Sequence, residues 1–252
     1  MLKTLTTVAS VALPIEERWS VKRCRYAPDG SSVGRVCIAA GTHGDEMMGQ
    51  LIIYLVQQRI GEHPDALRGT VDFYPMLNPL GLDIGERLVP SGTRLDMNRA
   101  FPGSPNGTPL EYMCHQVIQD MRGADLVLDL HASARNKSEL YEVRVSAKES
   151  ERLLPRVRAL CPQLIWVYPD KGSFSASLTG ALGAVGTDAV ILEADERRRL
   201  PQEIAFSVQS SRLYLSALPI SLPQVMTNHT CFAPRSSVFR SQSRTTRGMR
   251  QA

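Results

Sequence analysis

The chain has 252 residues, 43% of them hydrophobic and 21% charged, which is enough for one large domain with a full core. No apolar stretch approaches the roughly 18 uninterrupted residues of a membrane span, so we expect a soluble protein without a membrane partner. The net charge of +4 arises in a tail, because five arginines follow residue 233 and the other 24 basic residues face 25 acidic ones, which excludes a nucleic-acid-binding body.

The N-terminus and the cysteines both bear on where the protein resides. Residues 1–19 have one lysine and a short apolar stretch diluted by threonines, which does not match a cleaved signal peptide, so we expect an irregular lead-in to the first strand. The five cysteines are odd in number, far apart and without a C-x-x-C pair. This pattern favours reduced thiols in a cytoplasmic protein over disulfides or a thiolate zinc site.

Strands alternate with helices along most of the chain. Apolar runs predict strands at 35–41, 70–76, 125–130 and 188–194, and alternating hydrophobicity predicts a half-exposed strand at 139–146. Helical spacing of apolar residues predicts helices at 45–60, 111–121 and 201–215. This order indicates an α/β fold with a largely parallel sheet and helices on both faces.

Two segments depart from this alternation. Residues 77–109 form a long stretch rich in Gly, Pro, Asn and Arg, and such segments inside a compact domain are usually functional. From residue 227 the sequence becomes Ser-, Thr- and Arg-rich without a hydrophobic period. We therefore expect one domain over 1–226 and a disordered tail over 227–252.

His43 and Glu46 stand where the first buried strand gives way to a helix. Ligands of open α/β sheets bind at the carboxyl ends of strands, so both side chains can point into the same crevice, with Gly41 and Gly44 forming the turn. Taken alone, the H-x-x-E pattern is a weak signal, because acids are also favourable in the first turn of a helix.

His131 directly follows the predicted strand 125–130 and would face the same crevice if the two strands are neighbours. Two histidines and one carboxylate are a usual ligand set of catalytic zinc, with a fourth position left for water. We therefore predict that His43, Glu46 and His131 hold one Zn²⁺ per chain. Asp129 lies on the same strand face as His131 and would either orient this ligand or form a buried salt bridge.

Three further groups can serve a reaction at such a metal. Glu193 follows four apolar residues, and burying an acid there is costly unless it is used or paired, so it is our candidate general base; Asp195 and Glu196 precede three arginines and fit a solvated surface better. In the long loop, Asn98 and Arg99 suit the capture of a substrate carboxylate, and Arg87 could stabilise an oxyanion. The alternative for this loop is ordinary surface salt bridges.

The segments HGDE, NPLG, R-x-x-P, D-x-NR-x-FPG, DLH and LE occur here in this order. Over roughly residues 35–218 the chain thereby resembles the succinylglutamate desuccinylase/aspartoacylase family of zinc carboxypeptidase-like enzymes. The resemblance implies a three-layer zinc carboxypeptidase-like (phosphorylase/hydrolase-like) fold with a mixed, largely parallel sheet. It also implies roles for seven residues: zinc ligands His43, Glu46 and His131, base Glu193, carbonyl-polarising Arg87, and carboxylate clamp Asn98 with Arg99. Arg94 competes with Arg87, since it too lies between NPLG and DMNR.

The activity that the resemblance implies is zinc-dependent hydrolysis of the linear, non-peptide amide bond of a small, carboxylate-bearing N-acyl amino acid, as in a deacylase or desuccinylase. The acyl group, the amino acid and the oligomeric state stay open. Two alternatives remain, a metallocarboxypeptidase acting on peptides and an inactive truncated relative. The second arises because family members commonly continue into a small β-rich C-terminal domain, of which we expect the tail 227–252 to be a remnant.

Overall fold

The computed structural model describes residues 1–90, 95–132, 140–160, 162–169, 172–194 and 237–240. The strands are β1 (Leu2–Ala12), β2 (Arg18–Ala27), β3 (Arg35–Ala40), β4 (Thr70–Tyr74), β5 (Leu126–Ala132), β6 (Glu142–Ser146), β7 (Leu164–Tyr168), β8 (Ala189–Ala194) and β9 (Ser237–Arg240). The α-helices are α1 (Met48–Glu62), α2 (Pro79–Ile84), α3 (Pro109–Met121), α4 (Ser150–Ala159) and α5 (Leu178–Ala184). Short 3-10 helices are η1 (Pro14–Glu16), η2 (Pro64–Ala66), η3 (Met97–Arg99) and η4 (Gly172–Ala176).

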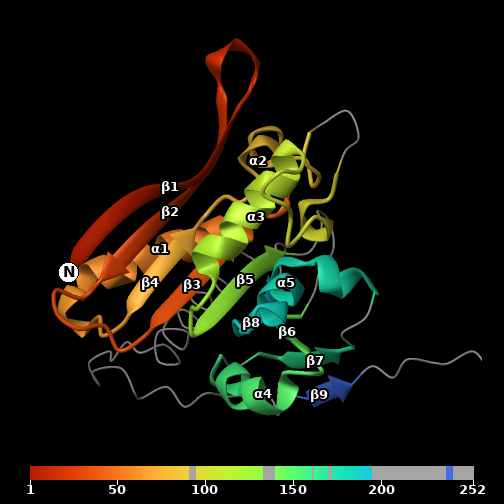
Figure 1. Cartoon of the computed structure of the whole chain (residues 1–252). Helices are drawn as coiled ribbons and strands as arrows, with labels where there is room; N and C mark the ends of the chain where they lie inside the picture. Colours follow the sequence, from red (N-terminus) through yellow and green to blue (C-terminus); the bar gives the residue numbers. More distant parts are fainter. Residues whose placement is uncertain (91–94, 133–139, 161, 170–171, 195–236, 241–252) are drawn as a thin grey trace, which may run out of the picture.

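The described strands form one sheet in the order β1-β2-β4-β3-β5-β8-β6-β7-β9 (Figure 1). The central strands β4, β3, β5 and β8 are parallel to one another. β6 is antiparallel to β8 and starts a second parallel group with β7 and β9, while β1 and β2 join β4 as an antiparallel hairpin. The predicted mixed, largely parallel sheet is thus confirmed.

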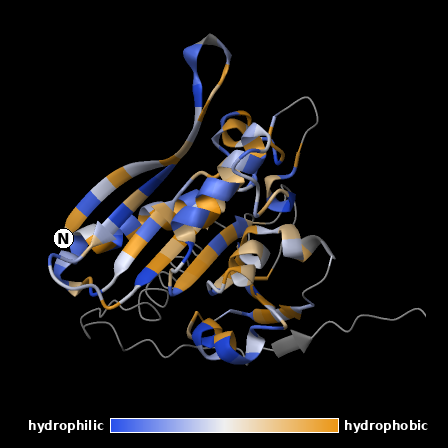
Figure 2. Cartoon of the chain, viewed as in Figure 1, coloured by the Kyte–Doolittle hydropathy of each residue, from blue (hydrophilic) through white to orange (hydrophobic). Residues whose placement is uncertain are grey.

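Helices cover both faces of this sheet and form two separate hydrophobic cores. On one face, Ile53 and Val56 of α1 and Leu153 of α4 pack on the buried side chains of the central strands. On the other face, α3 and α5 form the second core through residues such as Met113 and Leu182. Hydrophobic residues follow the central strands (Figure 2), as expected for strands buried on both faces. The three-layer α/β architecture predicted from the sequence is confirmed.

Most of the predicted central elements are observed. The expected strands at 35–41, 70–76, 125–130 and 188–194 are β3, β4, β5 and β8, and the expected helix at 111–121 is α3. The helix predicted from residue 45 is α1, which begins only at Met48, because the preceding residues form the turn that carries the candidate ligands. The predicted half-exposed strand at 139–146 is β6, and it is mostly buried, since α4 packs on its Val143 face while Glu142 and Arg144 pair on the other. That exposure prediction was wrong.

The expected irregular N-terminal lead-in is also wrong. β1 and β2 pair antiparallel from Leu2↔Ala27 to Ala12↔Arg18, and β2 extends the sheet through Cys24↔Phe73. Hydrophilic and hydrophobic residues are interspersed along this hairpin (Figure 2), and its turn projects beyond the rest of the described chain (Figure 1). The short apolar stretch belongs to a two-stranded ribbon that is stabilised by cross-strand pairs. Residues 1–19 alone do not predict this pairing, because the partner strand β2 extends to Ala27.

Strand β9 lies inside the predicted tail 227–252. It pairs in parallel with β7, from Leu164↔Ser237 to Val167↔Arg240. The sequence shows no strand pattern there because four residues are too few to establish one, and the pairing uses backbone groups at the edge of β7. The rest of this tail, the predicted helix at 201–215 and the boundary at residue 226 lie outside the described residues.

None of the helices in the described part of the chain combines the length and the apolar character that crossing a membrane requires.

Candidate active site

A tight turn between β3 and α1 carries His43 and Glu46. Gly41 adopts a φ of +69°, which favours glycine. Gly44 packs so closely on the α2 segment that an added Cβ would lie 2.0 Å from the carbonyl carbon of Gly81. The amide N of Gly44 donates to the carbonyl O of Arg87 at 3.4 Å. The two glycines thus let the turn and the long loop approach each other at the carboxyl end of β3.

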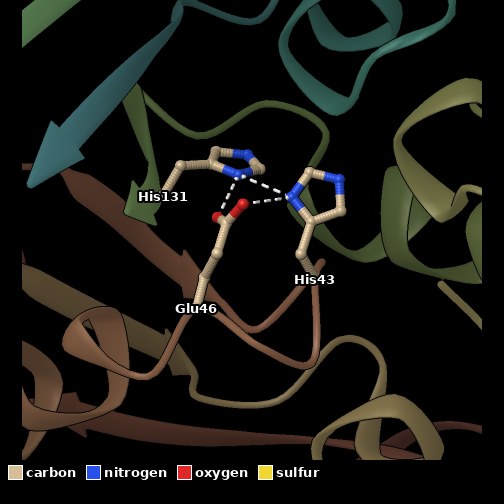
Figure 3. A group of neighbouring side chains, drawn as sticks. All are labelled: His43, Glu46 and His131. Carbon is tan, nitrogen blue, oxygen red and sulfur yellow. Dashed lines mark hydrogen bonds and ion pairs between the residues drawn. The ribbon is translucent and has the colours of Figure 1, made fainter. Parts of the chain in front are cut away.

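The three predicted metal ligands converge (Figure 3). Nδ1 of His43 lies 2.9 Å from Oε1 of Glu46, and Nδ1 of His131 lies 2.9 Å from Oε2 of Glu46. The two Nδ1 atoms are 3.2 Å apart, and one ligand atom from each residue lies within 4.8 Å of the others. All three side chains are buried. We call His43, Glu46 and His131 the ligand triad.

Both imidazoles are oriented by a carboxylate on the far side of the ring. Nε2 of His131 lies 3.1 Å from Oδ2 of Asp129, which is fully buried on the same strand. Nε2 of His43 lies 3.2 Å from Oδ1 of Asp96, whose side chain also accepts the amide N–H of Asn98 at 2.8 Å. Carboxylates in this position fix the ring and the tautomer of metal-binding histidines. Asp129 is thus paired directly with the candidate ligand His131, a contact that fits either of its two expected roles.

The pKa values of the ligand triad reflect this packing. Burial would raise the pKa of Glu46, but hydrogen bonds from His131 and His43 outweigh it and hold that pKa far below its ordinary value. Burial would lower the pKa of His131, yet the nearby Asp129 and Glu46 raise it well above its ordinary value. The pKa of His43 is raised as well, because the hydrogen bonds to Asp96 and Glu46 outweigh burial. The surroundings thus favour positive charge at the two rings.

The donor set fits a divalent cation. The carboxylates of Glu46, Asp96 and Asp129 surround the two imidazoles, and Arg87 supplies one guanidinium, so the formal charges leave two negative charges when both rings are neutral. Buried charge is costly unless it is paired or binds a metal. Two imidazole nitrogens and a carboxylate are also the ligand types that zinc prefers in catalytic sites.

Arg87 reaches the ligand triad directly. Its Nη1 donates to Oε1 of Glu46 at 2.5 Å, and its side chain is 42% exposed. The guanidinium therefore lies where the triad meets solvent. Its rival in the sequence, Arg94, lies outside the described residues.

Glu193 lies one strand away from the triad. In the parallel pair β5 and β8 its register partner is His131, so the two side chains project from the same face of the sheet. The Glu193 side chain is 10% exposed, and its Oε1 lies 2.9 Å from Nη1 of Arg144 on β6. The predicted base is thus beside the predicted metal group and paired with an arginine.

Asn98 and Arg99 lie in η3, directly after Asp96. The side-chain oxygen of Asn98 accepts the amide N–H of Leu178 at 3.1 Å, which ties η3 to the start of α5. Arg99 is exposed, and its Nη1 donates to the carbonyl O of Asn98 at 2.6 Å. Asp96 links the backbone N–H of Asn98 to His43, whereas the Arg99 side chain contacts the Asn98 carbonyl. Part of the Asn98 amide already has a structural partner.

Two contributors to this site were not identified from the sequence. Asp96 orients His43, and the signal was present, since Asp96 opens the D-x-NR segment that was singled out for Asn98 and Arg99. Arg144 pairs with Glu193, and no local signal marks it, because an arginine in an alternating strand is ordinary on a solvated face.

The chain is similar to known proteins of one family. The model of the succinylglutamate desuccinylase/aspartoacylase catalytic domain matches residues 32–216. Among curated proteins, N-alpha-acetyl-L-2,4-diaminobutyric acid deacetylase from Halomonas elongata is 32% identical over 101 residues, which are 39% of this chain and 28% of that protein.

Solved structures share the fold. The succinylglutamate desuccinylase/aspartoacylase from Rhodobacter sphaeroides superposes with a TM-score of 0.72 at 18% identity, covering 88% of this chain and 66% of that one. The product-bound ectoine utilization protein EutE (DoeB) from Ruegeria pomeroyi gives 0.75 at 15% identity, covering 96% and 73%. A metallo-carboxypeptidase from Burkholderia cenocepacia gives 0.65 at 16% identity, covering 86% and 64%. The predicted zinc carboxypeptidase-like fold is confirmed.

Proposed function

Because the chain belongs to the succinylglutamate desuccinylase/aspartoacylase family, we propose that it is a zinc-dependent hydrolase that cleaves the amide bond of a small N-acyl amino acid. The observation that carries this proposal is the convergence of His43 and Glu46, from the turn after β3, with His131 of β5, and both outer ring nitrogens contact carboxylates. A site built only for stability has no need of two buried imidazole nitrogens 3.2 Å apart.

Zinc bound by the ligand triad would supply a Lewis acid and a water of lowered pKa. The other steps fall to side chains. Glu193 takes a proton from the attacking water and returns it to the leaving nitrogen, which requires a carboxylate within reach of the triad. Arg87, whose guanidinium lies against Glu46, donates hydrogen bonds to the carbonyl oxygen as it becomes an oxyanion when water attacks the carbonyl carbon.

Asn98 and Arg99 bind the substrate carboxylate in this proposal. Arg99 is exposed and has a forked donor group, and Asn98 contributes its amide nitrogen while its oxygen stays on Leu178. Holding the carboxylate there would keep the scissile amide near the triad, which removes much of the entropic cost of the reaction.

The substrate class draws on the relatives. The Halomonas relative is named as a deacetylase for an Nα-acetylated amino acid, which supports an N-acyl amino acid as substrate here. A second candidate is peptide hydrolysis, favoured by the structural likeness to a metallo-carboxypeptidase. In either case the product set is a carboxylic acid and an amine.

The first test is metal content. We expect about one zinc per chain in the purified protein and its loss in His131→Ala, while His63→Ala, a histidine outside the triad, keeps it. Absence of zinc from the metal-loaded wild type would contradict the proposal.

The second test is turnover. Amine release is measured from N-acetyl and N-succinyl amino acids and from dipeptides, and we expect the acyl amino acids to be cleaved faster. Glu193→Gln should keep its zinc and lose about 10²–10⁴-fold in kcat. Full activity in that variant would refute the role of Glu193, and faster cleavage of dipeptides would favour the peptidase.

A further inference from the structure

Arg144 in the middle of β6 is held on three sides. Its Nε donates to Oε1 of Glu142 at 2.6 Å, and its Nη1 lies 2.9 Å from Oε1 of Glu193. The guanidinium carbon lies 5.0 Å from the ring centroid of Trp166 on β7, and Phe174 meets that ring edge-on at 6.3 Å. A side chain restrained in this way has little rotational freedom left.

The strand register explains why an arginine is needed at this position. β6 and β8 are antiparallel, and Glu142 lies directly opposite Glu193. Side chains in such pairs project to the same face with Cβ atoms about 4.5–5.5 Å apart, where like charges repel. The two side chains are only 12% and 10% exposed, so water screens this repulsion poorly. The guanidinium of Arg144 bridges the two carboxylates.

We infer that Arg144 is a positioning residue, which holds the carboxylate of Glu193 in one orientation beside His131. This inference rests on the proposed function, in which Glu193 acts on water at the ligand triad. A planar guanidinium that gives Nε to one acid and Nη1 to another fixes the direction as well as the distance of each contact, which a lysine ammonium does not. Trp166, the register partner of Arg144 on β7, supports the guanidinium from its own strand.

Arg152 supplies a matched comparison at the other end of β8. Its guanidinium pairs with Asp188, which directly precedes that strand, and its side chain is 58% exposed. Both arginines thus tie a carboxylate of the β8 region to a neighbouring element. Asp188 lies at the amino end of the strand, whereas Glu193 lies at the carboxyl end with the triad.

The kinetic test compares Arg144→Met with Arg152→Met in the full, zinc-loaded chain. We expect kcat of Arg144→Met to fall by about 10–100-fold, since misplacing a reacting group has effects of this size, while KM stays within about threefold. Arg152→Met should keep kcat within about twofold. Zinc content and thermal unfolding establish that each variant is folded and loaded. A kcat for Arg144→Met equal to that of Arg152→Met would overturn the inference.

Two further variants guard against a simple packing defect. Arg144→Lys retains the charge without the fork, so we expect a kcat between those of the wild type and Arg144→Met. Glu142→Gln added to Arg144→Met removes the repulsion and should recover part of the lost kcat. A lysine variant as slow as the methionine variant, together with no recovery in the double variant, would indicate lost packing and contradict the inference.

Trp166 gives a readout that does not require turnover. In metal-free protein carrying Trp19→Phe, the emission of Trp166 reports on the guanidinium next to it. Glu193→Gln weakens the hold on Arg144 and should shift this emission, whereas Arg152→Met should not. An unchanged spectrum in Glu193→Gln would contradict the pairing.

The two proposals fail in different ways. If Glu193→Gln hydrolyses acyl amino acids as fast as the wild type, the assignment of Glu193 in the proposed function is refuted. If Glu193→Gln is inactive and Arg144→Met turns over normally, the proposed function stands and the role of Arg144 is refuted.

Discussion

Asp72 on β4 is a fully buried carboxylate surrounded by arginines from neighbouring strands. Its Oδ1 accepts a hydrogen bond from Nε of Arg25, and its Oδ2 accepts from Nη2 of Arg25 and from Nε of Arg35, all at 2.7 Å. Nε of Arg23 lies 3.8 Å from Oδ1. The substitution Asp72→Asn keeps the volume of this side chain and removes its charge, so it tests what the network contributes to stability.

The expected cost follows from the contacts. Whichever way the new amide is turned, its NH₂ group faces at least one arginine donor, and the remaining bonds lose one charged partner. Hydrogen bonds to charged groups contribute about 1.5–3 kcal/mol each. Breaking a buried ion pair from one side costs about 3–5 kcal/mol in total. We therefore expect the free energy of unfolding of Asp72→Asn to fall by about 3–5 kcal/mol at pH 7.

The assay is urea denaturation followed by tryptophan fluorescence and far-ultraviolet circular dichroism. Glu62→Gln is the control, since Glu62 pairs with Arg59 at 2.8 Å on the surface and is 59% exposed. Such a pair contributes at most about 1 kcal/mol. If Asp72→Asn lowers the free energy of unfolding no more than Glu62→Gln does, the reasoning is refuted.

The same prediction has a pH dependence with a defined sign. Burial would raise the pKa of Asp72, but hydrogen bonds from Arg25 and Arg35 outweigh it and hold that pKa below its ordinary value of 3.8. A carboxyl with a lowered folded-state pKa stabilises the fold above its unfolded value and loses this contribution as the pH falls through the folded value. The difference in the free energy of unfolding between the wild type and Asp72→Asn should thus be constant near neutrality and decrease only below about pH 4.

Two other predictions concern the ligand turn and a buried thiol. Gly44→Ala should displace the turn and lower the zinc content of metal-loaded protein, because the added Cβ would lie 2.0 Å from the backbone of Gly81. The control is Gly61→Ala in α1, whose added Cβ meets open space. We expect this control to raise the free energy of unfolding by about 0.5–1 kcal/mol in the same denaturation assay. Burial raises the pKa of the Cys37 thiol to about 12, so a thiol reagent at pH 8 should modify Cys37 only after the protein is denatured. Mass spectrometry locates the modified residues, and modification of Cys37 in the native protein would contradict this prediction.

The central elements of the fold could be predicted from the sequence because each carries its own signal. The strand 35–41 is apolar throughout and bounded by glycines, and the helix 111–121 repeats apolar residues with helical spacing. The hairpin of residues 2–27 has neither an apolar run nor helical spacing. The 11 residues of β1 are mostly exposed, and the strand is stabilised by its pairing with β2. The exposure of β6 also depends on a partner, the helix α4 that packs on it.

The candidate site divides in the same way. His43, Glu46, His131 and Glu193 each stand at the carboxyl end of an apolar strand, which is a local property of the sequence. These side chains come close together because β3, β5 and β8 are adjacent in the sheet, and this strand order is a property of the tertiary structure.

The amino-acid sequence by itself determined the α/β class, the positions of the central strands and the residue types that can bind zinc, because hydrophobic periodicity and glycine turns act over a few neighbouring residues. The tertiary structure alone decided which side chains orient and neutralise these groups: Asp96 on His43, Arg87 on Glu46 and Arg144 on Glu193. Each of these contacts joins residues that are more than 40 positions apart, so it exists only once the sheet register and the loop packing have been formed.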